Sequence, residues 1–327
     1  MKNIAIIGSG SWGTALGIYL AKQGNNIKIW SYAKEEADLI NNEKKCKFLP
    51  EAEIPNNISC YLNYEEVING SDIILHVTPS KVTRSTFKEY KKYTTNQPVI
   101  ICSKGLELDT LYTLEEVIKE EKSDTIIGIL SGPSHAEEVA KNIPTALVLA
   151  SKENKLLKEL QTLFSSETLR VYSSNDVKGV ELGGALKNII AFCSGIANSM
   201  GLGDNSMAAL ITRGLSEITR LGIKMGAKAE TFYGLSGLGD LIVTCSSKHS
   251  RNRKAGELIG IGKTLEETKK EVGMVIESID NIEVAHKLAQ KYDVEMPIVE
   301  AVYDILYNEL NPKEAVTMLM TRELREE

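Results

Sequence analysis

The chain has 327 residues, enough for about two domains of ordinary size. Charged residues make up 25% of it and hydrophobic residues 43%, as in soluble globular proteins, and its formal net charge is −6. Because an acidic chain lacks the positive field of a nucleic-acid binder, we expect no nucleic-acid partner, and local groups must hold any anionic ligand.

The sequence also argues against secretion, a membrane span and a metal centre. No window approaches the ~18 consecutive apolar residues of a membrane span. Only four apolar residues lead into Gly8, fewer than the ~7–15 of a signal peptide. The five cysteines are odd in number and form no Cys-x-x-Cys motif, and the four histidines are scattered. We therefore expect reduced thiols, a cytoplasmic protein and no metal site.

The first half of the chain alternates short β-branched runs with segments of helical length. The predicted strands are 3–7, 27–30, 72–77, 99–102, 125–130 and 145–149, with helical stretches such as 11–23 and 111–121 between them. Most of these runs are almost continuously apolar, as in parallel strands that are buried on both faces. This alternation predicts an α/β fold with an N-terminal, doubly wound Rossmann domain.

The second half shows helical periodicity without alternating strand patterns. A turn-rich stretch at 171–176 follows a plausible strand, and the predicted helices after it are 178–200, 206–224, 250–259, 264–270, 279–291, 297–308 and 312–319. We place a dinucleotide-binding domain at 1–175 and an all-helical substrate and catalytic domain at 176–327. The short junction favours a ligand cleft between closely packed domains.

A glycine-rich turn follows the first predicted strand. Gly8, Gly10 and Gly13 form the pattern G-x-G-x-x-G between a strand and a helix. Gly8 allows the tight turn, Gly10 lets the backbone approach a pyrophosphate, and Gly13 lets the helix pack closely on the strand. An ordinary glycine turn is the alternative, but the flanking elements favour a dinucleotide site at the free N–H groups of the helix.

The second predicted strand leaves the choice of cofactor open. The acid that binds the adenosine ribose is expected ~20 residues after the glycine turn, but no Asp or Glu precedes Glu35. Its absence weakens the case for strict NAD preference. Lys34 follows the strand and could pair with a 2′-phosphate, although a lone lysine there is usually solvated. Both NAD and NADP therefore remain candidates.

Three polar turns follow predicted strands at the edge where α/β sheets bind ligands. They are Val77-Thr-Pro-Ser80, Ser103-Lys104-Gly105 and Ser131-Gly-Pro-Ser-His135. Lys104 is well placed to meet an anionic ligand, although an ordinary surface lysine is the simpler interpretation. Three such turns together favour a binding edge.

The helix that begins near residue 178 carries two glycines and a lysine. Gly183 and Gly184 each cost a helix about 1 kcal/mol relative to Ala, which suggests close approach of another backbone or a cofactor. Lys187 lies on the face of Gly183, just before an apolar run. Partial burial would lower its pKa and make it a usable acid or base. A lysine at the rim of a buried helix is the equal alternative.

Two later segments carry one acid and a local basic cluster. Asp240 lies in the glycine-rich segment 235–245, and Ser250-Arg251 opens a helix ten residues later. Ser250 is a good N-cap, and Arg251 offers a fork of donors to a phosphate. The segment therefore predicts an anion site, although a solvated basic helix end would show the same composition.

Together these segments resemble the NAD(P)-dependent glycerol-3-phosphate dehydrogenase family of bacterial type. The matching pieces occur in the family's order and cover nearly the whole chain. They are GSGSWGTA at 8–15, SKGLE at 103–107, SGPSHAEEVA at 131–140, ELGGALKNIIA at 181–191, LSGLGDLIVTC at 235–245, SRNRKAGE at 250–257 and MPIVEAVYDILY at 296–307.

The resemblance implies reduction of dihydroxyacetone phosphate to sn-glycerol 3-phosphate by NADH or NADPH, which supplies glycerophospholipid synthesis. The implied proton donor and acceptor is Lys187, with Lys104 and Asp240 beside the substrate. The implied substrate-binding residues are Lys104, Gly132, Ser134, Lys187, Asn188, Asp240, Ser250, Arg251 and Asn252. The implied cofactor-binding residues are Gly8, Gly10, Ser11, Trp12, Gly13, Tyr32, Lys104, Ala136, Arg251, Val275 and Glu277.

The chain departs from the family after the second predicted strand. Tyr32-Ala33 stands where the family often has a basic pair such as His-Arg, so the arginine expected to grip a 2′-phosphate is missing. One rival interpretation is a β-hydroxyacid dehydrogenase, which also joins a Rossmann domain to a helical one and uses lysine. A nucleotide-sensing protein without catalysis is the other, but it would leave Lys187, Asp240 and Arg251 without a purpose. The apolar helices of the second domain are compatible with a homodimer.

Overall fold

The computed structural model describes residues 1–324 and 326. The chain forms two compact units, which we call unit 1 (residues 1–104 and 112–181) and unit 2 (residues 105–111 and 182–327). Helix α8, Val177–Ser199, begins in unit 1 and continues into unit 2.

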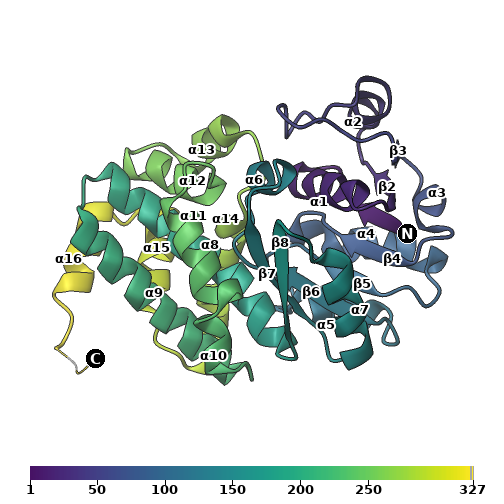
Figure 1. Ribbon diagram of the computed structural model, residues 1–327. Coiled ribbons are helices and arrows are strands. Elements are labelled where there is room, and N and C mark those ends of the chain that lie inside the picture. The colour runs from purple at the N-terminus through teal and green to yellow at the C-terminus, as the bar shows by residue number, and fades with distance from the viewer. Residues whose placement is uncertain (325, 327) are drawn as a thin grey trace. The chain divides into compact units, whose positions relative to one another are not determined.

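Unit 1 is built on one eight-stranded sheet (Figure 1). The strands lie in the order β3-β2-β1-β4-β5-β6-β7-β8, so the order reverses between β1 and β4. Ligands of open α/β sheets bind at the carboxyl ends of the strands beside such a reversal. The strands are β1 Asn3–Ile7, β2 Asn26–Trp30, β3 Ile58–Tyr61, β4 Ile73–His76, β5 Val99–Ile101, β6 Ile127–Ser131, β7 Thr145–Ala150 and β8 Leu169–Ser174.

Helices cover both faces of this sheet, as its side-chain alternation requires. Ile4 and Ile6 of β1 pack in one apolar cluster with residues of α1 and α7, whereas Ala5 and Ile7 pack in another with residues of α3, α4 and α5. The doubly wound fold predicted from the sequence is therefore confirmed. The helices are α1 Ser11–Lys22, α2 Lys34–Asp38, α3 Tyr64–Ile68, α4 Thr83–Tyr90, α5 Leu114–Glu121, α6 Ala136–Ala140 and α7 Asn154–Phe164, with shorter turns η1 Leu39–Glu43, η2 Ser80–Val82 and η3 Lys91–Tyr93.

Two strands were missed or cut short by the sequence-based expectation. Strand β3 has only four residues and is half-buried at alternate positions, so it lacks the continuous apolar run used to recognise the others. The prediction of a turn-rich stretch at 171–176 is wrong for residues 171–174, because β8 extends to Ser174. Polar and exposed residues are tolerated there because β8 is the edge strand of the sheet.

Strand β7 runs antiparallel to β6, whereas the sequence predicted parallel strands. Only 13 residues separate Ser131 from Thr145, and their single helix, α6, has five residues. A helix of five residues spans roughly 8 Å, while returning along a five-residue strand takes roughly 17 Å. The chain therefore re-enters the sheet from the same edge and reverses direction.

The named secondary-structure elements among the described residues of unit 2 are all helices, which confirms the predicted all-α half. Each predicted helix is present, with ends shifted by at most two residues. The described helices after α8 are α9 Asp204–Lys224, α10 Ala229–Phe232, α11 Asp240–Ser246, α12 Arg251–Gly260, α13 Leu265–Val272, α14 Glu277–Tyr292, α15 Pro297–Tyr307 and α16 Pro312–Met320, with a π-helical turn, η4, over Leu235–Gly239.

Helix α8 is long and apolar enough to cross a membrane by length and composition, but its most apolar window is completely buried. Its side chains, among them Leu182, Leu186 and Ile190, form the centre of the apolar core of unit 2. The hydrophobicity of α8 is therefore explained by core packing.

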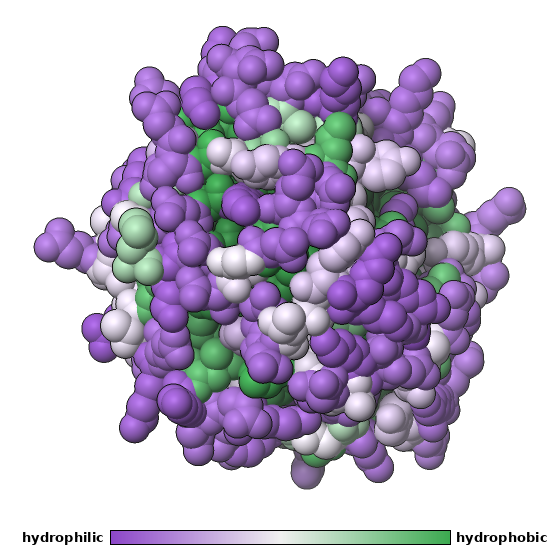
Figure 2. All heavy atoms as spheres, turned by 90° about the vertical axis from the view of Figure 1, so that its right-hand side faces the viewer, coloured by the Kyte–Doolittle hydropathy of each residue, from purple (hydrophilic) through white to green (hydrophobic). Residues whose placement is uncertain are grey.

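The molecular surface beside α2 and α3 carries mainly hydrophilic side chains, with apolar atoms visible between them (Figure 2). All five cysteines are free and buried. Among the described residues, no group of three or more His, Cys, Asp or Glu side chains is arranged to hold a metal ion.

Candidate active site

The glycine turn of unit 1 has the geometry that close backbone packing demands. Gly8 has φ +125°, and a Cβ there would lie 2.8 Å from the carbonyl oxygen of Val77. A Cβ on Gly13 would lie 2.1 Å from the carbonyl oxygen of Gly8. Only glycine fits both positions. By contrast, a Cβ on Gly10 would meet nothing within 4 Å, so the backbone at Gly10 is open to an approaching ligand.

The first turn of α1 offers hydrogen-bond donors beside this opening. Gly10 is the N-cap of α1, no side chain caps it, and the first turn carries no acidic residue. The Nε1 atom of Trp12 is buried without a hydrogen-bond partner among the described residues. Uncapped N–H groups at a helix start attract phosphate, and an orphaned buried donor needs a partner. These features fit a dinucleotide.

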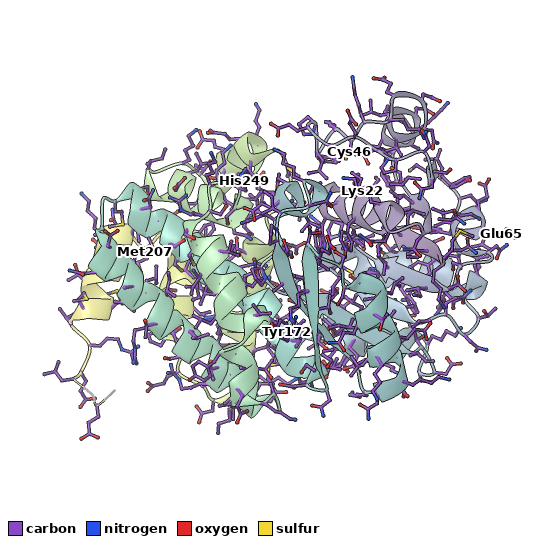
Figure 3. The ribbon with its side chains drawn as sticks, in the orientation of Figure 1. Lys22, Cys46, Glu65, Tyr172, Met207 and His249 are labelled. Atoms are coloured by element: carbon purple, nitrogen blue, oxygen red, sulfur yellow. The ribbon has the colours of Figure 1, made fainter. Side chains whose placement is uncertain are left out.

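The side chains of Thr14 and Cys46 contact the backbone of the glycine turn. Thr14 Oγ1 donates a hydrogen bond to the carbonyl of Ser9 at 3.1 Å. The Sγ atom of Cys46, labelled in Figure 3, lies 3.5 Å from Thr14 Oγ1 and 3.9 Å from the same carbonyl. The turn is therefore fixed before any ligand arrives.

An acidic group lies at the carboxyl ends of β1 and β2, although the sequence showed no acid before Glu35. Ser9 Oγ donates to Glu36 Oε2 at 2.5 Å, and Ser31 Oγ lies 3.2 Å from the same oxygen. The first turn of α2 brings residue 36 back toward the sheet, which a count of residues along the chain cannot show. The neighbouring Tyr32 is 91% exposed.

The polar turns after β5 and β6 meet at the carbonyl of Gly132. Lys104 Nζ donates to this oxygen at 2.9 Å, and Ser134 Oγ donates to it at 3.0 Å. Gly132 has φ +129°, a conformation that favours glycine. Ser103 Oγ donates to the carbonyl of Thr78 at 2.5 Å, which joins the turn after β4 to the turn after β5. The structure thus brings the three predicted turns to one edge of the sheet.

A buried histidine supports this edge. His76, the last residue of β4, is completely buried, and burial lowers its pKa to about 4, so its ring is neutral near pH 7. Its Nδ1 lies 3.1 Å from the hydroxyl of Tyr90, and its Nε2 lies 2.9 Å from Thr78 Oγ1. His76 therefore orients Thr78 through packing and hydrogen bonding.

Unit 2 holds Lys187 in a buried polar cluster. Lys187 is 5% exposed and Asp240 is 2% exposed. Lys187 Nζ donates to Asp240 Oδ1 at 2.8 Å and to Thr244 Oγ1 at 2.6 Å. The alternative that the sequence left open, a lysine at the rim of the helix that extends into solvent, is therefore wrong for Lys187.

The glycine before Lys187 explains how α8 reaches Asp240. A Cβ on Gly183 would lie 2.8 Å from the carbonyl oxygen of Ser236, so η4 packs directly on this turn of α8. This confirms the predicted close approach of another backbone. Asp240 begins α11 immediately after η4, and Thr244 lies one turn further on the same helix face. The sequence interpretation missed Thr244, although its i,i+4 spacing from Asp240 was a usable signal.

Two asparagines tie three helices of unit 2 together. Asn252 Nδ2 donates to Asn188 Oδ1 at 3.0 Å, and Asn252 Oδ1 accepts from the backbone N–H of Ser278 at 3.0 Å. These contacts join α8, α12 and the start of α14. Asn188 and Asn252, which directly follow Lys187 and Arg251 in the chain, are thereby held in fixed orientations.

The start of α12 is capped as predicted. Ser250 Oγ accepts from the backbone N–H of Arg253 at 3.2 Å. The exposed Arg251 donates from Nη1 to the carbonyl of Val275 at 3.2 Å. Glu277, the first residue of α14, lies two residues after Val275 in the chain. In unit 1, Ala136 is the first residue of α6. The expected site residues thus form one group in unit 1 and one in unit 2.

Comparison with known proteins matches both halves of the chain to models of one family. A model described as NAD-dependent glycerol-3-phosphate dehydrogenase N-terminus matches residues 3–157, and the corresponding C-terminus model matches residues 176–317. The chain belongs to this dehydrogenase family. Glycerol-3-phosphate dehydrogenase [NAD(P)+] of Fusobacterium nucleatum is 49% identical to it, over 99% of this chain and 98% of that protein. The enzyme of the same name from Agathobacter rectalis is 46% identical, over 99% and 97% of the two chains.

A solved structure agrees with this membership of the glycerol-3-phosphate dehydrogenase family. The crystal structure of glycerol-3-phosphate dehydrogenase from Coxiella burnetii matches with a TM-score of 0.95 and 39% identity. The match covers 98% of this chain and 99% of that one. The family assignment therefore rests on the whole chain.

Proposed function

We propose that this chain is an oxidoreductase that reduces dihydroxyacetone phosphate to sn-glycerol 3-phosphate, with NADH or NADPH as hydride donor. The observation that carries the proposal is the buried Lys187–Asp240 pair, because Asp240 and Thr244 hold an ammonium group in a fixed direction from which it can donate a proton. Family membership identifies the substrate class. The product is a precursor of glycerophospholipids.

The nicotinamide cofactor, when bound, supplies the hydride that the ketone carbon receives. Negative charge then develops on the former carbonyl oxygen. We assign to Lys187 Nζ the donation of a proton to that oxygen, which leaves a neutral amine to be reprotonated from water. The Asp240 carboxylate favours the ammonium form before the reaction, and Thr244 restricts the direction of the Nζ–H bonds.

The remaining polar residues are assigned to binding. Arg251 has the planar donor fork that phosphate recognition uses, and Lys104 adds a second cation. Binding energy from the phosphate, remote from the reacting carbon, can be used to orient the ketone. We assign substrate binding also to Gly132, Ser134, Asn188, Ser250 and Asn252, and cofactor binding to Gly8, Gly10, Ser11, Trp12, Gly13, Tyr32, Ala136, Val275 and Glu277.

We further propose that residues 1–175 serve as the dinucleotide-binding domain and residues 176–327 as the substrate and catalytic domain. A cytoplasmic location agrees with five free, buried thiols, which persist in reducing compartments. The alternative of a β-hydroxyacid dehydrogenase is less well supported, because both halves match the glycerol-3-phosphate dehydrogenase family.

A spectrophotometric assay tests the proposed activity. Dihydroxyacetone phosphate is mixed with the protein and either NADH or NADPH, and the loss of reduced-nicotinamide absorbance is followed. A rate that depends on this substrate and is absent with short 2-keto or 3-keto acids supports the proposal. Turnover of the keto acids alone would favour the β-hydroxyacid alternative, and dinucleotide binding without turnover would favour a sensing role.

A further inference from the structure

Ser9, Ser31 and Glu36 form a polar cluster, which we call the Glu36 cluster. Ser9 Oγ donates to Glu36 Oε2 at 2.5 Å, Ser31 Oγ lies 3.2 Å from the same oxygen, and the two hydroxyl oxygens are 2.8 Å apart. Ser9 is 5% exposed and Ser31 is 1% exposed, whereas Glu36 is only half-buried. The buried serines thus hold one carboxylate oxygen of a residue that is itself only half-buried.

The Glu36 cluster lies where two adjacent strands end beside the glycine turn. Ser9 is inside that turn, directly after Gly8, whose N–H donates to the carbonyl of Trp30 at 3.1 Å. Ser31 follows the last residue of β2, and its N–H donates to the carbonyl of Tyr61 at 2.9 Å. The backbone of Ser31 is therefore tied to the sheet edge directly, and that of Ser9 through the adjoining Gly8.

The general geometry of dinucleotide-binding sheets indicates what this edge meets. The pyrophosphate lies at the N-terminus of the first helix, and the adenosine ribose lies at the end of the second strand, where a carboxylate binds its 2′-hydroxyl. Glu36 is the one acidic side chain whose carboxylate is joined by hydrogen bonds to both strand ends among the described residues. Its place in the chain, as the third residue of α2, hides it from a search at the strand end itself.

We propose that Glu36 makes this chain select NAD(H) over NADP(H). The inference rests on the proposed function, because it assumes that the glycine turn binds a dinucleotide. A carboxylate accepts hydrogen bonds from ribose hydroxyls but repels a 2′-phosphate, and like charges brought together at a binding site are strongly unfavourable. The two serine hydroxyls hold the carboxylate at this edge, so it cannot easily turn away from an added phosphate.

One feature of the same segment favours the opposite selectivity. Lys34 begins α2 and is exposed, so its ammonium group is a candidate partner for a 2′-phosphate. Lys34 has a flexible four-carbon stem in solvent, where an ion pair contributes little. Glu36 is held by two buried hydroxyls, so its repulsion of a 2′-phosphate dominates.

Direct binding measurements on the full chain, without substrate, test the proposal. Isothermal titration calorimetry compares NAD+ with NADP+, and adenosine 5′-monophosphate with adenosine 2′,5′-bisphosphate. We expect the 2′-phosphorylated member of each pair to bind at least about tenfold more weakly, which corresponds to about 1.4 kcal/mol. Equal or tighter binding of both 2′-phosphorylated ligands would overturn the selectivity. Failure of every ligand to bind would instead contradict the proposed dinucleotide site.

Three variants assign the effect to the carboxylate. Glu36→Gln removes the charge, so the discrimination against NADP+ should fall by about tenfold or more. Glu36→Asp keeps the charge and should keep most of the discrimination. Glu35→Gln is the matched control, because Glu35 is an exposed acid on the same helix turn, and this variant should bind both dinucleotides like the wild type. Unchanged discrimination in Glu36→Gln, or its loss in Glu35→Gln, would refute the role of Glu36.

Discussion

The ammonium nitrogen of Lys187 lies 2.8 Å from Oδ1 of Asp240, although 53 positions separate the two residues in the sequence. Both side chains are almost completely buried. Burial makes each charge dependent on the other, because an unpaired charge in the core would be strongly unfavourable. Substitutions in this pair should therefore change both the turnover and the stability of the protein, and different variants can separate the two effects.

Replacing Lys187 should abolish most turnover. We expect Lys187→Met to lower kcat by about 10²–10⁴-fold, because a positioned acid contributes that much to a proton transfer. NAD+ affinity, measured by calorimetry, should change little, because Gly8, Gly10 and Gly13 lie in the other unit. Lys224→Met, at an exposed lysine of α9, is the control. A kcat near the wild-type value in Lys187→Met would contradict the assigned role.

The same pair predicts a stability effect that is independent of catalysis. Lys187→Met removes the cation that lies 2.8 Å from the buried Asp240 carboxylate and should destabilise the protein by about 3–5 kcal/mol. The double variant Lys187→Met/Asp240→Leu removes both charges and should recover most of that loss without recovering turnover. Urea denaturation and steady-state assays measure the two quantities. Recovery of activity in the double variant would show that neither residue takes part in the reaction.

The hydroxyl of Thr244 should matter for turnover more than for substrate affinity. Thr244→Val removes the oxygen that accepts from Lys187 Nζ at 2.6 Å. Because hydrogen bonds to charged groups contribute about 1.5–3 kcal/mol, we expect kcat to fall by roughly 10–100-fold. Thr244→Ser keeps the hydroxyl and should retain most of the activity. Wild-type activity in Thr244→Val with a loss in Thr244→Ser would indicate a packing role for the methyl group and contradict the role of the hydroxyl.

The glycine turn offers two substitutions with opposite consequences. Gly13→Ala places a Cβ 2.1 Å from the Gly8 carbonyl oxygen and should destabilise the fold, seen as a lower melting temperature. Gly10→Ala meets nothing within 4 Å and has a compatible φ of −66°, so the fold should be unaffected. The added methyl group would keep the pyrophosphate of the dinucleotide away from the backbone of residue 10. NAD+ affinity should therefore drop about tenfold or more.

The control for Gly10→Ala is Gly203→Ala. Gly203 is also a helix N-cap, with φ −75° and open space around its Cβ position. It belongs to the start of α9 and has no part in the dinucleotide site. If both alanine variants weaken NAD+ binding equally, the effect comes from helix capping and the role of Gly10 is wrong.

Glu217 predicts a pH dependence of stability. Both of its carboxylate oxygens accept from backbone N–H groups at the start of α15, and burial raises its pKa from an ordinary value of 4.5 to about 7. The folded state therefore binds a proton more tightly than the unfolded state. The stabilisation is full below pH 4.5 and is lost as the pH rises to about 7, a change of about 3 kcal/mol.

Urea midpoints between pH 4.5 and 7.5 measure this effect. Glu217→Gln should flatten the decline relative to the wild type, because it removes the titrating group. Glu230→Gln, at an exposed glutamate of α10, should keep the wild-type slope. Parallel pH profiles for Glu217→Gln and the wild type would show that other groups cause the decline.

Local patterns predicted most of the elements that position the site. The apolar runs identified six of the eight strands, and the helical period placed every helix of unit 2 that was named in advance. The runs failed for β3, which is short and partly exposed, and for the direction of β7, which depends on the length of α6. Strand direction is a property of the connection, so the strand's own residues carry no signal for it.

The roles of Glu36 and Thr244 were hidden for a similar reason. Each lies on the first turns of a short helix, and the turn brings its side chain to a partner outside the expected position. Glu36 meets Ser9 across 27 positions, and Thr244 meets Lys187 across 57 positions. A motif search by spacing examines one segment at a time. It could have related Thr244 to Asp240, but it cannot pair Thr244 with Lys187 or Glu36 with Ser9.

The amino-acid sequence alone determined the two halves of the protein and the glycine turn. These follow from local chemistry: the absence of a Cβ and the spacing of apolar residues. The sequence also offered Lys187 as a candidate acid, through the resemblance of its segment to the dehydrogenase family. Only the tertiary structure decided that Asp240 and Thr244 hold Lys187 and that Glu36 lies at the ends of β1 and β2. Burial and partnership of charged groups depend on how distant segments pack, because the dielectric and the donors around each charge come from other parts of the chain.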